Sequence, residues 1–198
     1  MFDDVADLEA RLQARLDPLD AVSDMLRSDR DLNPDWHASE KPLTPAAVLA
    51  PIVKRPEGWT MLLTERTHET PAHPGQISFP GGRVEASDAG PVDTALRETW
   101  EEIGLARDFI APVGGFGRYE TGTGFRITPV VGLVEPGFTL KLEPREVAQA
   151  FEAPLSFLFN PANHERREGE WRGQRRFYWA MPYEDRFIWG ATAGMIRA

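Results

Sequence analysis

Three glutamates recur at short intervals in the middle of the chain, at Glu98, Glu101 and Glu102. On an α-helix, positions i, i+3 and i+4 share one face, so the three carboxylates converge on one patch. Like charges at this spacing repel one another and destabilise a helix unless a cation neutralises them. Hard divalent ions such as Mg²⁺ and Mn²⁺ bind oxygen ligands, so the spacing predicts a site for one of these metals. The alternative for these residues is an ordinary solvated helix face.

The residues around this cluster fit a helix that follows a glycine-rich turn at 81–82. Pro91 suits the first position of a helix, where its missing N–H is not needed, and Gly104 suits the end of one. Arg97 stands four residues before Glu101. At that spacing a guanidinium can pair with a carboxylate and hold it in one orientation.

The other face of this helix carries apolar residues. Leu96, Trp100 and Ile103 follow one another at i, i+4 and i+7. This spacing predicts a stripe that faces the core, roughly opposite the glutamates.

Several other segments gather apolar residues in the way that strands do. The run 46–53 predicts a buried strand with Pro51 at an edge or bulge, in a hairpin with 59–64. Pro129 is expected to break regular pairing in a strand over 125–133. The remaining expected elements are strands over 75–79, 138–142, 177–181 and 186–188, and helices over 145–150 and 189–196.

Residues 1–44 are expected to form an N-terminal helical extension and linker, ahead of a domain at 45–198. Apolar residues at helical spacing predict a first helix that ends by Pro18, and a second short helix is expected over 21–26. In the domain, strands alternate with two or three helices. This order predicts an α/β (α+β) fold with a central mixed β-sheet and helices packed on its faces.

The composition narrows the classes of function. The 198 residues carry a net charge of −9 and include no cysteine. These values exclude a disulfide framework, a zinc–thiolate site and a cysteine nucleophile, and they argue against a nucleic-acid partner. The sequence shows no long apolar run and no signal-peptide pattern, so we expect no membrane partner and a cytoplasmic location.

The order of glycine turn, helix and clustered glutamates resembles the signature of the Nudix hydrolases. That signature is a glycine, five residues, a glutamate, seven residues and then Arg-Glu-apolar-x-Glu-Glu-x-Gly-apolar. Here Gly82 is followed by five residues, Asp88, eight residues and the run 97–105, Arg-Glu-Thr-Trp-Glu-Glu-Ile-Gly-Leu. The departures are Asp88 for glutamate, one added residue and Thr99 at an apolar position. The resemblance implies a Nudix-type α/β/α sandwich.

The added residue and the stretch before the glycine pair resemble one branch of that family, similar to coenzyme A diphosphatases. The motif of that branch is Leu-Leu-Thr-x-Arg-Ser-x-x-x-Arg-x-x-x-Gly-x-Val-x-Phe-Pro-Gly-Gly. Residues 62–82 match it at most positions, but Pro71 replaces the second arginine. This change leaves ADP-ribose, a dinucleotide or a nucleoside triphosphate as alternative substrates.

The resemblance implies metal-dependent hydrolysis of a diphosphate linkage in a nucleoside diphosphate derivative, most simply coenzyme A. It also implies Mg²⁺ or Mn²⁺ as cofactor and a small-molecule nucleotide as partner, with a homodimer as one alternative for the assembly. A non-catalytic binding module is the alternative of another class, although such modules usually lose the glutamates. The roles implied are metal ligands at Glu98, Glu101 and Glu102, catalytic groups at Glu98, Glu101, Arg97 and Glu146, and substrate contacts at Arg66, Gly81 and Gly82.

Within that set, two glutamates compete for the role of general base. Glu98 is one candidate, but a carboxylate that binds a metal is a poorer base than a free one. Glu146 is the other, and its alternative role is to stabilise the first turn of a helix. Asp88 is expected to support the turn and Arg97 rather than to bind metal.

Overall fold

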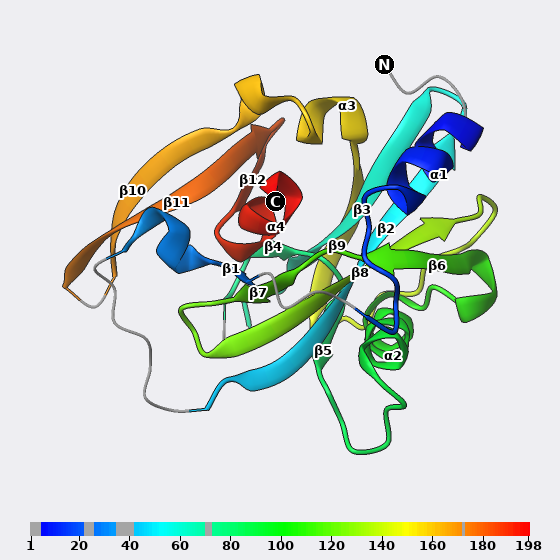
Figure 1. Cartoon of the computed structure of the whole chain (residues 1–198), viewed down its shortest axis with the longest axis horizontal. Coiled ribbons are helices and arrows are strands. Elements are labelled where there is room, and N and C mark those ends of the chain that lie inside the picture. The colour runs from blue at the N-terminus through cyan, green and yellow to red at the C-terminus, as the bar shows by residue number, and fades with distance from the viewer. Residues whose placement is uncertain (1–4, 22–25, 35–41, 70–72, 172) are drawn as a thin grey trace.

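A mixed β-sheet forms the centre of the molecule in the computed structural model, which describes residues 5–21, 26–34, 42–69, 73–171 and 173–198. Within these residues nine strands make the sheet, in the order β1-β7-β8-β2-β3-β4, with β5, β6 and β9 pairing to β2, β8 and β3 (Figure 1). The strands are β1 (Leu26–Ser28), β2 (Thr44–Arg55), β3 (Gly58–Arg66), β4 (Ile77–Ser78), β5 (Gly81–Arg83), β6 (Ile110–Gly115), β7 (Arg118–Glu120), β8 (Phe125–Val134) and β9 (Val147–Pro154).

The longest strand, β2, is buried on both faces from residue 46 to residue 53, as its continuous apolar run predicts. It pairs in parallel with β8 from residue 44 to residue 53 and antiparallel with β3 as the predicted hairpin. Two prolines mark places where a partner strand changes. Pro51 lies between the β5 and β3 ladders of β2, and Pro129 lies between the β7 and β6 ladders of β8. The parallel pairing of β2 with β8 continues through both prolines. The expected break in pairing therefore occurs only on the side of each strand that faces away from this parallel partner.

One face of the sheet is covered by helix α2 (Pro91–Ile103), which begins with Pro91 and ends at Gly104 with φ of 65°. Leu96 and Ile103 are buried as predicted, but Trp100 is 55% exposed, so its assignment to the core stripe is wrong. Thr99 occupies the buried position instead, and its hydroxyl donates to the Ala95 carbonyl at 2.6 Å. Because that bond satisfies the hydroxyl, a small polar residue fits where the helix packs closely on the sheet.

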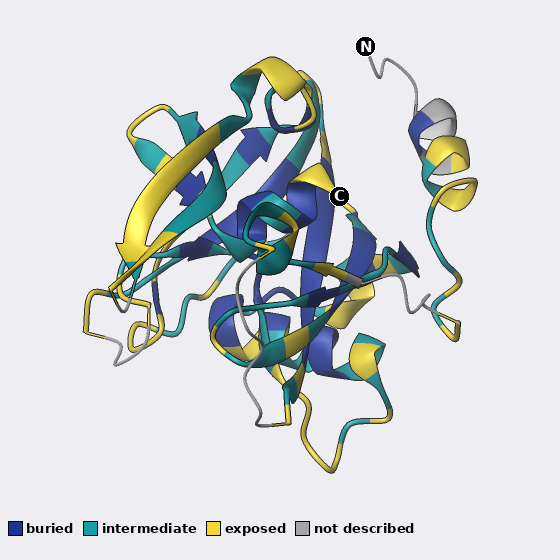
Figure 2. Ribbon diagram, turned by 60° about the vertical axis from the view of Figure 1, so that its left-hand side comes forward, coloured by how far each residue is buried: buried dark blue, intermediate teal, exposed yellow. Residues whose placement is uncertain are grey.

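The opposite face of the sheet is covered by a second layer. It contains α3 (Leu155–Leu158), a three-stranded antiparallel sheet and α4 (Ala191–Arg197). Met181 and Ile188 point from the small sheet into the core beside the side chains of β2 and β3, and Figure 2 shows this buried layer in dark blue. The strands of the small sheet are β10 (Glu165–Trp171), β11 (Gln174–Tyr183) and β12 (Arg186–Trp189). Helices therefore lie on both faces of a mixed sheet, which confirms the predicted α/β sandwich.

The N-terminal residues lie against this sandwich. Helix α1 (Val5–Gln13) places Leu8 in the core, and it ends before Pro18. Strand β1 pairs in parallel with β7 and leads into the short helix η1 (Asp29–Leu32). A helix was expected over 21–26, but residue 26 is the first residue of β1, so the predicted end of that helix is wrong. Residues 22–25 lie outside the described chain.

Two other predicted elements are wrong. Residues 138–142 form no strand, although Phe138, Leu140 and Leu142 pack on the α2 side of the core. Residues 147–150, expected in a helix, belong to β9, which pairs antiparallel with β3 from Val147↔Arg66 to Pro154↔Thr60. Short 3₁₀ turns, η2 (Arg107–Phe109) and η3 (Pro161–Asn163), complete the described elements. Among the helices described here, none has both the length and the apolar character needed to cross a bilayer.

Candidate active site

Glu102 is the most deeply placed of the three glutamates, with only 5% of its surface exposed. The Gly81 N–H donates to its Oε2 at 3.2 Å, and Arg66 Nη1 lies 4.0 Å from its Oε1. Burial raises the pKa of Glu102 to about 8, the Gly81 hydrogen bond opposes the rise, and the neighbouring Glu98 carboxylate adds to it. The side chain is therefore an acid held next to the glycine turn, with one partly buried arginine as its cationic neighbour.

Glu98 lies one helical turn before Glu102 and packs directly on the second glycine of the turn. A Cβ atom added to Gly82 would lie 2.5 Å from Glu98 Cδ, so a larger residue would displace this carboxylate from the place it holds here. Gly81 has φ of 152°, and a Cβ there would lie 2.4 Å from the Ala47 carbonyl oxygen. Burial raises the pKa of Glu98, Arg97 opposes the rise, and the charges of Glu101 and Glu146 add to it.

Arg97 organises the surface beside these carboxylates. Its Nε and Nη2 donate to the two oxygens of Asp88, at 2.8 Å and 3.0 Å, in a bidentate pair. Its Nη1 donates to Glu98 at 3.1 Å and to Glu101 at 2.9 Å, so the predicted i, i+4 pair is present. The Arg83 carbonyl accepts a further bond from Nη2 at 3.0 Å. The guanidinium thus joins the turn, through Asp88, to two of the clustered glutamates.

Asp88 is held by more than the arginine. It accepts from the Glu85 N–H at 2.8 Å and from the Thr94 hydroxyl at 2.7 Å. These bonds, led by the pair with Arg97, hold the pKa of Asp88 well below its usual range. The expectation that Asp88 supports the turn and Arg97 agrees with these contacts. We did not predict from the sequence that buried Thr94 takes part in this network. Its position in the first turn of α2 was the signal that could have pointed to it.

The residues upstream of the turn reach the same region through β3. The side chain of Arg66 at the end of β3 has a buried Nε with no hydrogen-bond partner, and its Nη1 faces Glu102. Next to it, the Thr67 N–H donates to the Glu146 carbonyl at 3.0 Å, just before β9 begins. Glu146 is exposed, and its charge acts on both Glu98 and Glu102. The structure therefore brings the upstream and downstream candidates to one region, while Pro71 lies outside the described residues.

The metal that the sequence predicts can be compared with this donor set. Among the described residues, no three Asp, Glu or His side chains are already gathered around one point as a bound ion would require. In this arrangement Arg97 donates to Glu98 and Glu101, while Gly81 and Arg66 face Glu102. The chemistry of the donors still fits a hard divalent ion, since two neighbouring carboxylates have raised pKa values that a bound cation would lower.

Comparisons with known proteins show what the chain is similar to. The family model described as the NUDIX domain matches residues 43–178. A relative named "Uncharacterized Nudix hydrolase NudL", from Enterobacter sp. (strain 638), is 39% identical over 152 residues, which cover 77% of this chain and 79% of the relative. A protein of the same name from Escherichia coli (strain K12) is 38% identical over 152 residues, with the same coverage.

Among solved structures, a C. elegans Ap4A hydrolase binary complex matches 58% of this chain and 82% of its own, with a TM-score of 0.49 and 19% identity. The evidence for the family comes from the domain match and the sequence relatives, which cover most of the chain that carries the glycine turn and the glutamate helix. The chain therefore belongs to the Nudix hydrolase family.

Proposed function

We propose that the enzyme hydrolyses the diphosphate linkage of a nucleoside diphosphate derivative. Water adds to one phosphorus, the bridging P–O bond breaks, and two phosphate esters leave. The observation that carries this proposal is the pair of adjacent, partly desolvated carboxylates, Glu98 and Glu102, packed against the Gly81–Gly82 turn. Two such carboxylates with raised pKa values form a site that favours a cation, and cations neutralise diphosphate substrates.

Glu98, Glu101 and Glu102 would hold Mg²⁺ or Mn²⁺, the metals that Nudix hydrolases generally need, and the Gly82 carbonyl is a further candidate by family analogy. When bound, such an ion polarises phosphoryl oxygens and makes a coordinated water more acidic. Arg97 acts here as a positioning residue, because its bonds to Glu98 and Glu101 are anchored at the other end by Asp88. Its contribution is to hold two flexible side chains on one side of α2.

We propose Glu146 as the general base, in preference to Glu98. The Glu146 side chain is exposed and makes no hydrogen bond or ion pair with the described residues. Its charge nevertheless acts on Glu98 and Glu102, so it stands within electrostatic reach of the cluster. A free carboxylate can accept a proton from water more readily than one that binds a cation.

Arg66 is the proposed contact for the substrate's phosphates, with the backbone of Gly81 and Gly82 beside it. The buried and unpaired Nε of Arg66 supports this role, because a buried donor without a partner costs free energy that an anionic ligand would recover. The resemblance of residues 62–82 to the coenzyme A diphosphatase branch favours coenzyme A or a derivative as substrate. Pro71, in place of an arginine in that motif, favours ADP-ribose, a dinucleotide or a nucleoside triphosphate as the second candidate.

The proposal is tested by a substrate panel in Mg²⁺ and in Mn²⁺, with product analysis. Wild-type enzyme is expected to release two phosphate esters from coenzyme A, whereas Glu101→Gln and Glu102→Gln should fall to background while keeping the wild-type circular dichroism spectrum. Glu135→Gln is the matched control, because this exposed glutamate has no side-chain partner among the described residues. Full activity in either cluster variant would overturn the metal assignment, and rapid turnover of ADP-ribose with none of coenzyme A would move the assignment to the second candidate.

We also propose that residues 45–198 form the catalytic domain and that residues 1–44 are an extension packed on it. Two contacts support this division. Leu8 of α1 is buried in the core, and β1 adds a parallel strand to β7 at one edge of the central sheet.

A further inference from the structure

A cavity of about 610 Å³ lies where β1 and η1 face α4 and β11, and we name it the β1–α4 cavity. Its volume falls within the range of small-molecule sites, about 300–1,000 Å³. None of its lining residues belongs to α2, β3, β5 or β9, so it is separate from the candidate active site. The residues used below are Arg27, Asp29, Asp31, Phe159, Trp179 and Arg197.

Each of the two acidic side chains of the cavity accepts hydrogen bonds from the protein. Asp29 accepts from the Tyr119 hydroxyl at 2.8 Å and from the Gly122 N–H at 2.8 Å, one bond for each carboxylate oxygen. Asp31 accepts from the Ser28 N–H at 3.3 Å as part of the capping box of η1. Both carboxylates therefore serve to hold β1, β7 and η1 together.

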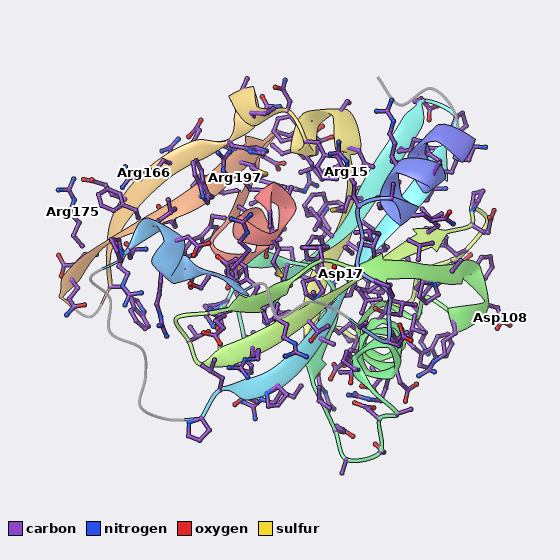
Figure 3. All side chains as sticks on the ribbon, in the orientation of Figure 1. Arg15, Asp17, Asp108, Arg166, Arg175 and Arg197 are labelled. Atoms are coloured by element: carbon purple, nitrogen blue, oxygen red, sulfur yellow. The ribbon has the colours of Figure 1, made fainter. Side chains whose placement is uncertain are left out.

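The two arginines of the cavity, Arg27 and Arg197, have no carboxylate partner among the described residues. Arg27 is exposed, and its side chain makes no hydrogen bond or ion pair with any described residue. The guanidinium of Arg197 lies 3.9 Å from the centre of the Trp179 ring, and its Nη1 lies 3.0 Å from His164 Nδ1 (Figure 3 labels Arg197 on α4). His164 Nε2 lies 2.7 Å from the Leu158 carbonyl, which can only accept, so Nδ1 is the acceptor for Arg197. Neither arginine pairs with a carboxylate within the described chain.

The cavity also offers flat apolar surface. Phe159 is 38% exposed and makes no ring–ring or cation–π contact with the described residues. The guanidinium of Arg197 is itself a flat surface, held in place by Trp179 on one side. Aromatic rings stack on such surfaces, and guanidinium groups also bind phosphate or carboxylate in their own plane.

We propose that the β1–α4 cavity is a second ligand site, for a small anion that carries a flat ring, such as a nucleoside monophosphate. The anion pairs with Arg27 and Arg197, and the ring packs against Phe159. The nucleotide released by the proposed reaction belongs to this class, but binding here requires neither turnover nor a metal.

The test is isothermal titration of the full chain with AMP in the presence of EDTA, beside adenosine and ribose 5-phosphate. Adenosine has the ring without the phosphate, and ribose 5-phosphate has the phosphate without the flat ring. Each is therefore expected to bind at least about ten-fold more weakly than AMP. Arg27→Gln and Arg197→Gln should each weaken AMP binding about ten-fold or more, the effect of losing one hydrogen bond to a charged group. Lys54→Gln, which removes an exposed charge on β2, should bind as wild type does.

Three results would overturn the proposal. The first is that AMP does not bind to the wild-type protein, and the second is that Arg27→Gln binds AMP as tightly as wild type does. The third is that Arg66→Gln loses AMP binding while Arg27→Gln keeps it, which would assign the nucleotide to the candidate active site. Hydrolysis by Arg27→Gln is expected to match that of the wild-type enzyme. A failure of the second site is therefore distinguishable from a failure of the proposed function.

Discussion

Replacing Glu102 by glutamine should stabilise the metal-free protein at neutral and alkaline pH. Burial raises the pKa of this side chain from an ordinary value of 4.5 to about 8 in the folded state. A group with a raised pKa in the folded state contributes stability below its unfolded pKa, and that contribution is lost as pH rises to the folded value. The loss is about 1.4 kcal/mol per pH unit, so it reaches roughly 5 kcal/mol between pH 4.5 and pH 8. Glutamine removes this loss, because it stays neutral and can still accept the Gly81 hydrogen bond.

The measurement is the free energy of unfolding by urea in EDTA, at several pH values from about 4.5 to 8.5, for wild type and Glu102→Gln. The difference between the two proteins cancels the titration of groups that do not interact with Glu102. It should be close to zero at the acidic end and grow steadily in favour of the variant, to a few kcal/mol at pH 8. The matched control, Glu135→Gln, changes an exposed glutamate and should follow wild type within about 0.5 kcal/mol.

Parallel curves for wild type and Glu102→Gln across this pH range would refute the reasoning. They would mean that Glu102 is charged in the folded protein at no cost, so that the desolvated acid described above does not exist. Added Mg²⁺ extends the test, because an ion that binds only the folded wild type adds about 2.7 kcal/mol at a hundred-fold excess over its Kd. Glu102→Gln should gain much less.

Four further substitutions test the geometry. Gly82→Ala places a methyl group 2.5 Å from Glu98 Cδ, so hydrolysis should fall at least about ten-fold in kcat while the fold persists by circular dichroism. Ile103→Ala should lower the free energy of urea unfolding by about 2–5 kcal/mol, whereas Trp100→Ala should change it by under about 1 kcal/mol, and equal losses would contradict the burial described for α2. Asp88→Asn removes one charge from the bidentate arginine pair and should lower kcat with little change in KM, and wild-type kcat would show that this anchor is dispensable.

Local rules predicted the elements whose causes lie within a few neighbouring residues. Pro91 and Gly104 fix the ends of α2, because one lacks an N–H that the first turn does not use and the other adopts a left-handed conformation. The run 46–53 is apolar throughout, and a strand buried on both faces needs that pattern. The glutamates share a helix face because of helical spacing alone, and their order after the glycine pair pointed to the family.

Long-range packing decided what these rules could not. Thr99 and Trp100 are adjacent on α2, and the depth at which the helix meets the sheet selected the small residue for burial. Residues 147–150 formed β9 rather than a helix because the open edge of β3 supplied hydrogen-bond partners, and such pairing is invisible to local periodicity.

Residue types and spacing were enough to predict the family, the sandwich and the carboxylates that share α2. They did not predict that Glu102 is buried while Glu101 lies at the surface beside Arg97, or that two arginines far apart in the chain line one cavity. Burial and charge compensation depend on groups that folding brings together from distant parts of the chain. The spacing along a helix says which side chains are neighbours, but only the surrounding protein sets how much water each of them keeps.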